Sequence, residues 1–113
     1  MSNLIDMECV PVRSRDPQAT DEESASYMQQ VPDWNIIAVD GVNHFQRLYK
    51  FQNFVDALSF TNKVGALAEE QDHHPALLTE WGKVTVTWWT HVIKGLHQND
   101  FVSAAKSDRL YKE

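Results

Sequence analysis

The sequence of 113 residues has one cysteine, four glycines and four prolines, and it has no long apolar run. Because Cys9 has no second cysteine to pair with, no internal disulfide can form and the cysteine gives no indication of catalysis. No segment approaches the ~18 consecutive apolar residues of a membrane span. The N-terminal segment lacks the apolar core of a secretory signal. These absences predict a soluble, cytoplasmic protein that does not enter a membrane.

Positive charge and several catalytic motifs are also scarce. The formal net charge is −6, and no cluster of Lys and Arg interrupts it, so direct binding of nucleic acid is not expected. There is no G-x-S-x-G motif of a serine hydrolase and no glycine-rich loop that would hold phosphates. The sequence therefore gives no support for nucleotide-dependent chemistry.

The length and the hydrophobic content of 42% fit a single domain with a buried core. Residues 1–18 contain Pro11 and Pro17 and predict a flexible N-terminal leader. Residues 19–113 are predicted to form the one folded domain. The role of the leader stays open at this point.

The elements follow from caps, turns and periodicity. Thr20 with Glu23 forms a capping-box pattern, Asp40-Gly41 is a hairpin signal, and Asn53 is a candidate N-cap before an amphipathic helix. We expect helices at 21–30, 53–71 and 98–112 and strands at 34–39, 44–51, 76–81 and 84–91. This α-β-β-α-β-β-α order predicts an α+β fold, a four-stranded antiparallel sheet with three helices packed on one face. The open face or an uncovered edge strand predicts a homo-oligomer.

The most informative segment is Asp72-His73-His74-Pro75, at the end of the expected central helix. Pro75 prevents His74 from continuing a helix, so the two histidines stand at a junction that can direct them into a cleft. Imidazoles exchange protons near neutral pH, which suits acid/base catalysis. The structural alternative is that both imidazoles only favour the negative end of the helix dipole.

Alternation in the strand expected at 84–91 separates its two faces. Val84, Val86 and Trp88 should face the core, which places Trp89 and His91 on the other, less apolar face. Trp89 is then a candidate for stacking on a flat ligand. Without the other histidines, His91 would be read as a solvated residue at a strand end.

A metal site is a rival interpretation, since Asp72, His73 and His91 are the ligand types of a two-histidine, one-carboxylate centre. Adjacent histidines cannot easily reach one ion, however, and no H-x-x-x-H or H-x-H spacing is present. We therefore expect no metal ligands.

Seven positions match one known pattern. The arrangement resembles the signature of the pterin-4a-carbinolamine dehydratase family: Glu69-x-x-x-His73-His74-Pro75, Trp81, His91 and Asp100. Further similarity is found in Pro32-Asp33-Trp34, in Leu48-Tyr49-Lys50-Phe51 and in Thr90-His91 with Gly95-Leu96, so that the resemblance covers residues 20–112. At His97 the chain departs from the family, where a small hydroxyl residue often caps the last helix.

The resemblance implies dehydration of 4a-hydroxytetrahydrobiopterin to quinonoid dihydrobiopterin, a hydro-lyase reaction that needs no metal or organic cofactor. It implies that His73 and His91 are the acid/base pair, in an order left open, and that His74 binds and orients the substrate. Asp72 and Asp100 become candidates for orienting an imidazole or binding the polar edge of the pterin, and Pro75 and Trp89 complete the expected substrate-binding set.

The resemblance also implies partners. The reaction recycles tetrahydrobiopterin for aromatic amino acid hydroxylases, including phenylalanine hydroxylation, and a homodimer or homotetramer is expected. The alternative function is a non-catalytic oligomeric interaction module, of the kind that serves as a dimerisation cofactor of transcription factors.

Overall fold

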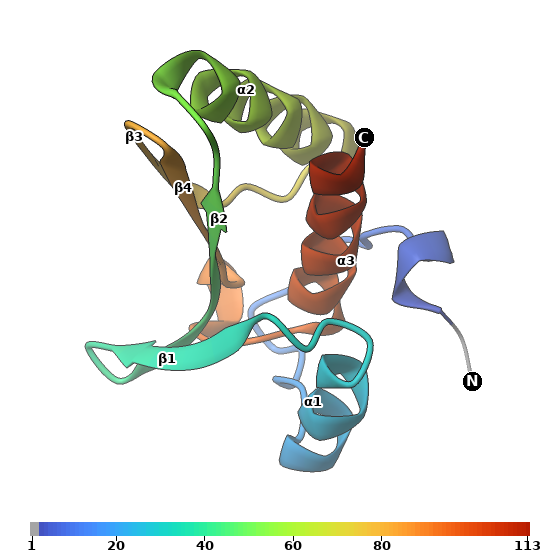
Figure 1. Cartoon of the computed structure of the whole chain (residues 1–113). Helices are drawn as coiled ribbons and strands as arrows, with labels where there is room; N and C mark the ends of the chain where they lie inside the picture. The colour runs from blue at the N-terminus through green and yellow to red at the C-terminus, as the bar shows by residue number, and fades with distance from the viewer. Residues whose placement is uncertain (1–2) are drawn as a thin grey trace.

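The computed structural model describes residues 3–113 and confirms the α+β fold class (Figure 1). Its helices are α1 (Asp21–Met28), α2 (Phe54–Gln71) and α3 (Gln98–Lys112), with short 3-10 turns η1 (Leu4–Asp6) and η2 (His91–Ile93). The strands β1 (Asn35–Val39), β2 (Val42–Lys50), β3 (Ala76–Glu80) and β4 (Lys83–Trp88) form one antiparallel sheet in the order β1-β2-β4-β3. The predicted element order is therefore confirmed.

Two tight hairpins set the register of the sheet. Val39 pairs with Val42 across Asp40 and Gly41, whose φ angles of 52° and 79° are typical of a type I′ turn. Glu80 pairs with Lys83 around a turn that contains Gly82, whose φ is 75°. The first of these turns twists in the same sense as the strands that it joins, which is why a two-residue connection suffices there.

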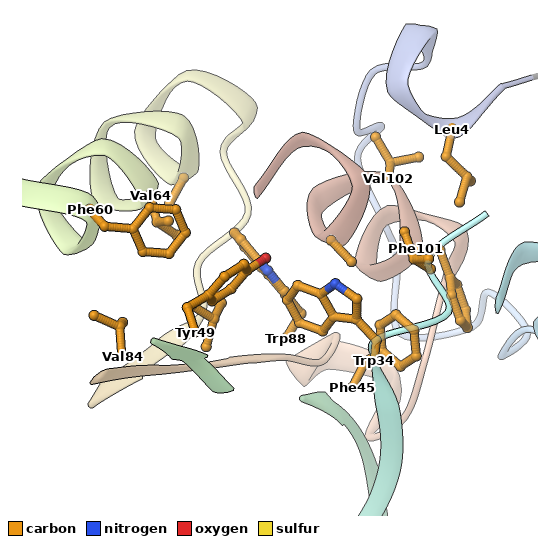
Figure 2. Close-up of a cluster of buried hydrophobic side chains, with 14 of the residues drawn as sticks. Leu4, Trp34, Phe45, Tyr49, Phe60, Val64, Val84, Trp88, Phe101 and Val102 are labelled. Carbon is orange, nitrogen blue, oxygen red and sulfur yellow. The ribbon is translucent and has the colours of Figure 1, made fainter. Parts of the chain in front are cut away.

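The core lies between the sheet and the helices. Phe45 and Tyr49 of β2 and Val84, Val86 and Trp88 of β4 are fully or almost fully buried, as the alternation in the sequence predicts. Figure 2 shows these aromatic rings of the sheet beside Phe60 and Val64 of α2 and Phe101 of α3. The helices α2 and α3 pack against the sheet and against each other, which holds the C-terminal end of α2 and the N-terminal end of α3 in place.

Side-chain caps define the starts of the helices. Thr20 and Glu23 form the predicted capping box of α1, and the Asn53 side chain accepts from the Asp56 backbone N–H at the start of α2. At α3 the cap is His97, whose Nδ1 accepts the N–H of Asn99 while Asp100 accepts the N–H of His97. An imidazole thus performs the capping role that a hydroxyl commonly performs.

The prediction of a strand reaching His91 is wrong. β4 ends at Trp88, and Thr90 forms an isolated bridge with Gly95 that closes a loop around η2. The Thr90 N–H donates to the Gly95 carbonyl, so the chain turns back before it can extend the ladder. His91 therefore begins a 3-10 turn and belongs to neither face of the strand.

The leader is in contact with the domain along the part that the structure describes. Leu4 is fully buried in the main core, and the Lys106 ammonium of α3 donates to the Ile5 carbonyl. In Figure 1 the segment passes beside α3. Residues 1 and 2 of the predicted leader lie outside the described residues, and its flexibility stays a prediction.

Candidate active site

A pocket of about 330 Å³ lies where four segments meet: the leader, the junction between α2 and β3, the connection from β4 to α3, and the first turn of α3. Its volume falls in the range of small-molecule sites. The lining residues are Val10, Pro11, Val12, Asp72, His73, His74, Thr90, His91, Val92 and Asn99. A larger hollow of about 480 Å³ near Lys50 and Tyr111 contains no histidine, so we place the chemistry in the first pocket.

The end of α2 directs two histidines to this pocket. Asp72 takes the left-handed conformation, with φ 51° and ψ 44°, and the His73 N–H donates back to the Ala68 carbonyl. Aspartate tolerates this conformation better than most residues, and Pro75 prevents a return to helix. The predicted junction is therefore present, and it separates the helix from β3 by only a few residues.

His73 is the most firmly held of the histidines. Its Nε2 lies 2.6 Å from Oδ1 of Asp100, a carboxylate with 0% exposure. Its ring also lies nearly parallel to the Trp88 ring, with an interplanar angle of 11° and a centroid distance of 5.5 Å. The ring can therefore rotate little, and a single orientation is presented to the pocket.

The hydrogen bonds of Asp100 assign the proton on His73. Oδ2 of Asp100 accepts from the Thr90 hydroxyl at 2.8 Å and from the His97 N–H at 2.9 Å. The oxygens of a carboxylate only accept hydrogen bonds, so in its contact with Asp100 the Nε2 of His73 is the donor and carries the proton. In the neutral ring the proton-accepting nitrogen is then Nδ1.

His74 is exposed and held differently. Its Nε2 lies 2.5 Å from Oε2 of Glu69, one turn back on α2. Both side chains are more than half exposed, so solvent screens this pair and its effect on stability is small. The contact orients the imidazole at the rim of the pocket, and it gives a role to Glu69, a residue of the sequence signature.

His91 sits on an aromatic row that the sequence did not reveal. The centroid of the His91 ring lies 4.6 Å from that of Trp89. The Trp89 centroid in turn lies 4.0 Å from the centroid of the buried His44 ring. Burial, followed by the nearby His91, lowers the pKa of His44. A neutral His44 keeps additional positive charge away from His91.

The cap of α3 is joined to the site through Asp100. Burial is the main cause that lowers the pKa of His97, and Nδ1 can accept the Asn99 N–H only when it carries no proton. Because Asp100 accepts from both His97 and His73, the start of the helix and the orientation of His73 depend on one side chain.

The structure brings most of the predicted residues together. The pocket is lined by Asp72, His73, His74 and His91. Asp100 does not line it but contacts His73. Pro75 and Trp89 do not line it.

Other lining residues were missed by the sequence analysis: Val10, Pro11, Val12, Val92 and Asn99. Thr90 was noted only as part of the family pattern. No local pattern marks a leader residue as part of a site, because its partners lie some 90 positions away.

Two further properties concern metals and membranes. Within residues 3–113, no group of three or more His, Cys, Asp or Glu side chains is arranged to hold a metal ion. None of the helices described for the same residues combines the length and apolar character needed to cross a bilayer.

The fold and the pocket together define a small α+β protein with a histidine-lined site suited to acid/base chemistry. The model of the family described as "Pterin 4 alpha carbinolamine dehydratase" matches residues 17–110. The chain belongs to this family, whose enzymes are hydro-lyases.

Similar proteins agree with that assignment. A protein of Nitrosococcus oceani is 56% identical over 112 residues, covering 99% of each chain, and one of Syntrophotalea carbinolica is 54% identical, covering 97% of this chain and 98% of its own. Both carry the provisional name pterin-4-alpha-carbinolamine dehydratase. A crystal structure from Brucella melitensis, titled transcriptional coactivator/pterin dehydratase, has a TM-score of 0.74 and 29% identity, covering 83% of this chain and 98% of its own.

Proposed function

We propose that this protein dehydrates 4a-hydroxytetrahydrobiopterin to quinonoid dihydrobiopterin and water by histidine acid/base catalysis. The observation that carries the proposal is that His73, His74 and His91 face one pocket, with His73 oriented by the buried Asp100. The family and the names of the relatives supply the substrate class.

The reaction requires two proton transfers. The bond between C4a and the hydroxyl oxygen breaks, and an acid protonates the departing oxygen to give water. A base removes the proton on N5, whose electron pair forms the C4a=N5 double bond. Histidine suits both tasks near pH 7 because its ordinary pKa lies close to that value.

The contacts favour His73 as the base and His91 as the acid, an order that the sequence leaves open. The Asp100 carboxylate keeps the proton of His73 on Nε2, which leaves Nδ1 free to accept the N5 proton. Asp100 also stabilises the imidazolium that forms, as a carboxylate does beside a histidine base. His91 is exposed and makes no comparable ion pair within the described chain, so it can exchange protons with water between turnovers.

The remaining predicted residues bind and orient the substrate. His74 lies at the rim of the pocket, and Asp72 lines the same pocket with a carboxylate that can accept N–H groups from the polar edge of a pterin. Trp89 acts indirectly, because it supports the His91 ring. No metal or organic cofactor takes part in this proposal.

We further propose that the product re-enters tetrahydrobiopterin recycling beside an aromatic amino acid hydroxylase in the cytoplasm. The hydroxylase would produce the 4a-hydroxypterin, and this protein would shorten the lifetime of that reactive intermediate. The carbinolamine also loses water unaided, so acid/base assistance of about 10²–10⁴-fold is sufficient for such a role.

The first test follows quinonoid dihydropterin formation by ultraviolet absorbance from freshly generated 4a-hydroxytetrahydrobiopterin, in buffer that contains EDTA. We expect acceleration by the wild-type protein that survives chelation. His73→Gln and His91→Gln should each lose about 10²–10⁴-fold of the rate enhancement, because glutamine keeps polarity but cannot transfer the proton.

The control for these variants is the fold itself, measured by circular dichroism and thermal unfolding. His74→Gln should raise KM more than it lowers kcat, since we assign this residue to binding. Full activity in His73→Gln or His91→Gln with an intact fold would remove the histidine mechanism, and no acceleration by the wild-type protein would remove the dehydratase proposal.

A second candidate function is an oligomeric interaction module. It is favoured by the open sheet face, where Leu48 and Leu78, both about half exposed, flank Thr85 in one row across β2, β4 and β3. The Brucella relative is titled a transcriptional coactivator as well as a dehydratase. Light scattering would detect the expected homodimer or homotetramer, and a stable protein partner without pterin turnover would favour the module over the enzyme.

A further inference from the structure

The leader forms one wall of the histidine pocket. Val10, Pro11 and Val12 line the same pocket as His73, His74 and His91. All three leader side chains are apolar, and Pro11 has no backbone N–H to donate. The side chains of this wall can therefore contact a ligand only through apolar surface, whereas the histidines and Asp72 supply polar side chains.

Paired hydrogen bonds hold the wall in place. The Val10 N–H donates to Oδ1 of Asn99 at 3.0 Å, and Nδ2 of Asn99 donates to the Val10 carbonyl at 2.7 Å. One residue earlier, the Cys9 N–H donates to Oε1 of Gln71 at 2.8 Å. Asn99 and Gln71 are both buried, so these bonds are protected from water.

The residues that hold the leader are neighbours of those that form the site. Asn99 directly precedes Asp100, which orients His73, and Gln71 directly precedes Asp72 and the two histidines. The wall and His73 are therefore positioned by the same two helix ends. A shift of the leader relative to His73 would require one of those ends to change.

A second leader contact supports the His91 loop. The Gln18 side-chain amide donates to the Ile93 carbonyl at 3.1 Å, and it lies so close to Gly95 that an added Cβ would approach it to 2.4 Å. The leader thus touches the pocket at its wall and, further along, touches the loop that carries His91.

The wall lies outside the part of the chain that the family model describes, which begins at residue 17. The Nitrosococcus oceani relative, by contrast, aligns with 99% of this chain, so the leader is shared with that protein. The wall is therefore an addition to the family domain, and the histidine chemistry does not account for it.

We propose that Val10, Pro11 and Val12 are a specificity-determining wall that binds the flat face of the pterin rings, and that Asn99 is a positioning residue for this wall. The identity of the ligand rests on the proposed function. Covering an apolar face of a planar ligand strengthens binding without assisting proton transfer. The wall should consequently affect KM and not kcat.

The test uses the full chain with three variants. The wall variant combines Val10→Ser and Val12→Ser, which keeps the backbone bonds to Asn99 and the buried Leu4. The positioning variant is Asn99→Ala. The control is Arg15→Ala, an exposed leader residue that does not line the pocket. Each is assayed for kcat and KM in dehydration and, independently of turnover, for the Kd of 7,8-dihydrobiopterin by isothermal titration calorimetry.

We expect the wall and positioning variants to raise KM and Kd about tenfold, the change that corresponds to losing part of one aliphatic contact. Their kcat should stay within about twofold of wild type, and the control should be unchanged. Adding Asn99→Ala to the wall variant should have little further effect if Asn99 acts through the leader.

Two outcomes would overturn the inference: unchanged KM and Kd in the wall variant, or an Asn99→Ala variant that lowers kcat alone and so acts through Asp100. The same measurements test the proposed dehydratase function independently of the wall. A wild-type protein that gives no turnover but binds dihydrobiopterin in a leader-dependent way would remove the dehydratase proposal and keep the wall. Turnover by the wild-type protein with an unchanged KM in the wall variant would keep the dehydratase proposal and remove the wall.

Discussion

Asp100 connects more parts of the site than any other single residue described above. Its carboxylate is fully buried and accepts from the side chains of His73 and Thr90 and from the His97 backbone. A buried charge is tolerated only when such partners compensate for lost hydration. Two of those partners, His73 and Thr90, line the pocket, and the third is the N-cap of α3, so the residue serves both the fold and the orientation of His73.

Asp100→Asn should lower kcat by about 10²-fold or more, because an amide cannot hold the Nε2 proton of His73 as a carboxylate does. Steady-state kinetics with far-ultraviolet circular dichroism provide the measurement. Asp56→Asn makes the same chemical change at an exposed position in the first turn of α2 and serves as the control. A normal kcat in Asp100→Asn would show that His73 does not need this partner.

The sequence identified residue types better than residue contacts. His73, His74 and His91 were found because adjacent imidazoles at a proline junction are unusual and because their spacing resembles a family. For Asp100 the sequence left two roles open, since nothing in its spacing shows that it touches His73. His44 escaped notice, because its contact with Trp89 arises only when β2 and the chain after β4 lie side by side.

At the scale of elements, α3 begins with a titratable cap. His97 Nδ1 accepts the Asn99 N–H, and burial lowers the pKa of His97. In the unfolded chain a histidine titrates near pH 6.5. The folded state therefore resists protonation that the unfolded state accepts, so this contribution is complete above about pH 6.5 and is lost as the pH falls through the lower folded-state pKa.

Replacing His97 with serine tests this dependence, because a serine hydroxyl can cap the helix without titrating in this range. When the pH falls from 7.5 to 5.5, the free energy of unfolding of the wild type should decrease more than that of His97→Ser. Urea unfolding at the two pH values measures it. Taking the difference cancels the effect of His44, whose pKa is also lowered. A difference that does not vary with pH would contradict the neutral imidazole cap.

Element prediction succeeded where the signal was local. The capping box at Thr20, the Asp40-Gly41 turn and the Asn53 cap each depend on neighbouring residues, and all three are confirmed. The end of β4 was misjudged because alternation continues past Trp88 in the sequence, whereas the pairing of Thr90 with Gly95 turns the chain away. That pairing forms because the chain turns back through η2, and hydrophobic periodicity alone does not reveal such a turn.

At the scale of the whole molecule, Asp108 joins the sheet to the last helix. Its Oδ1 accepts from the Trp34 indole, from Arg47 and from the Tyr49 hydroxyl, at distances of 2.9, 2.7 and 2.5 Å. Two of these donors come from β2 and the third, Trp34, directly precedes β1, while Asp108 belongs to α3. The group therefore links β2 and the start of β1 to the last helix, and Asp108 does not line the histidine pocket.

This cluster predicts a loss of stability in alkaline solution. Burial, reinforced by the Asp108 charge, raises the pKa of Tyr49 well above its ordinary value near 10. Above about pH 10 the unfolded chain loses the tyrosine proton and the folded chain keeps it, so stability falls with rising pH by about 1.4 kcal/mol per unit. Below that pH the contribution is fully present.

Tyr49→Phe should remove this dependence at the cost of one hydrogen bond, about 1–2 kcal/mol at pH 8. Denaturant unfolding of both proteins at pH 8 and pH 11 would measure it, and the stability advantage of wild type should shrink at the higher pH. Tyr111→Phe is a comparison at a more exposed hydroxyl in the same aromatic cluster. An advantage that is equal at both pH values would contradict the assignment.

The contact between Val10 and Asn99 has a consequence for how the protein becomes active during synthesis. The two residues are 89 positions apart, and Asp100 follows immediately. A growing chain therefore carries the leader and both adjacent histidines long before the residues that fix them have been translated. We expect a ribosome-bound chain that ends before residue 99 to have neither a closed pocket nor an oriented His73. The ability to turn over substrate should appear abruptly, only when the last helix leaves the ribosome.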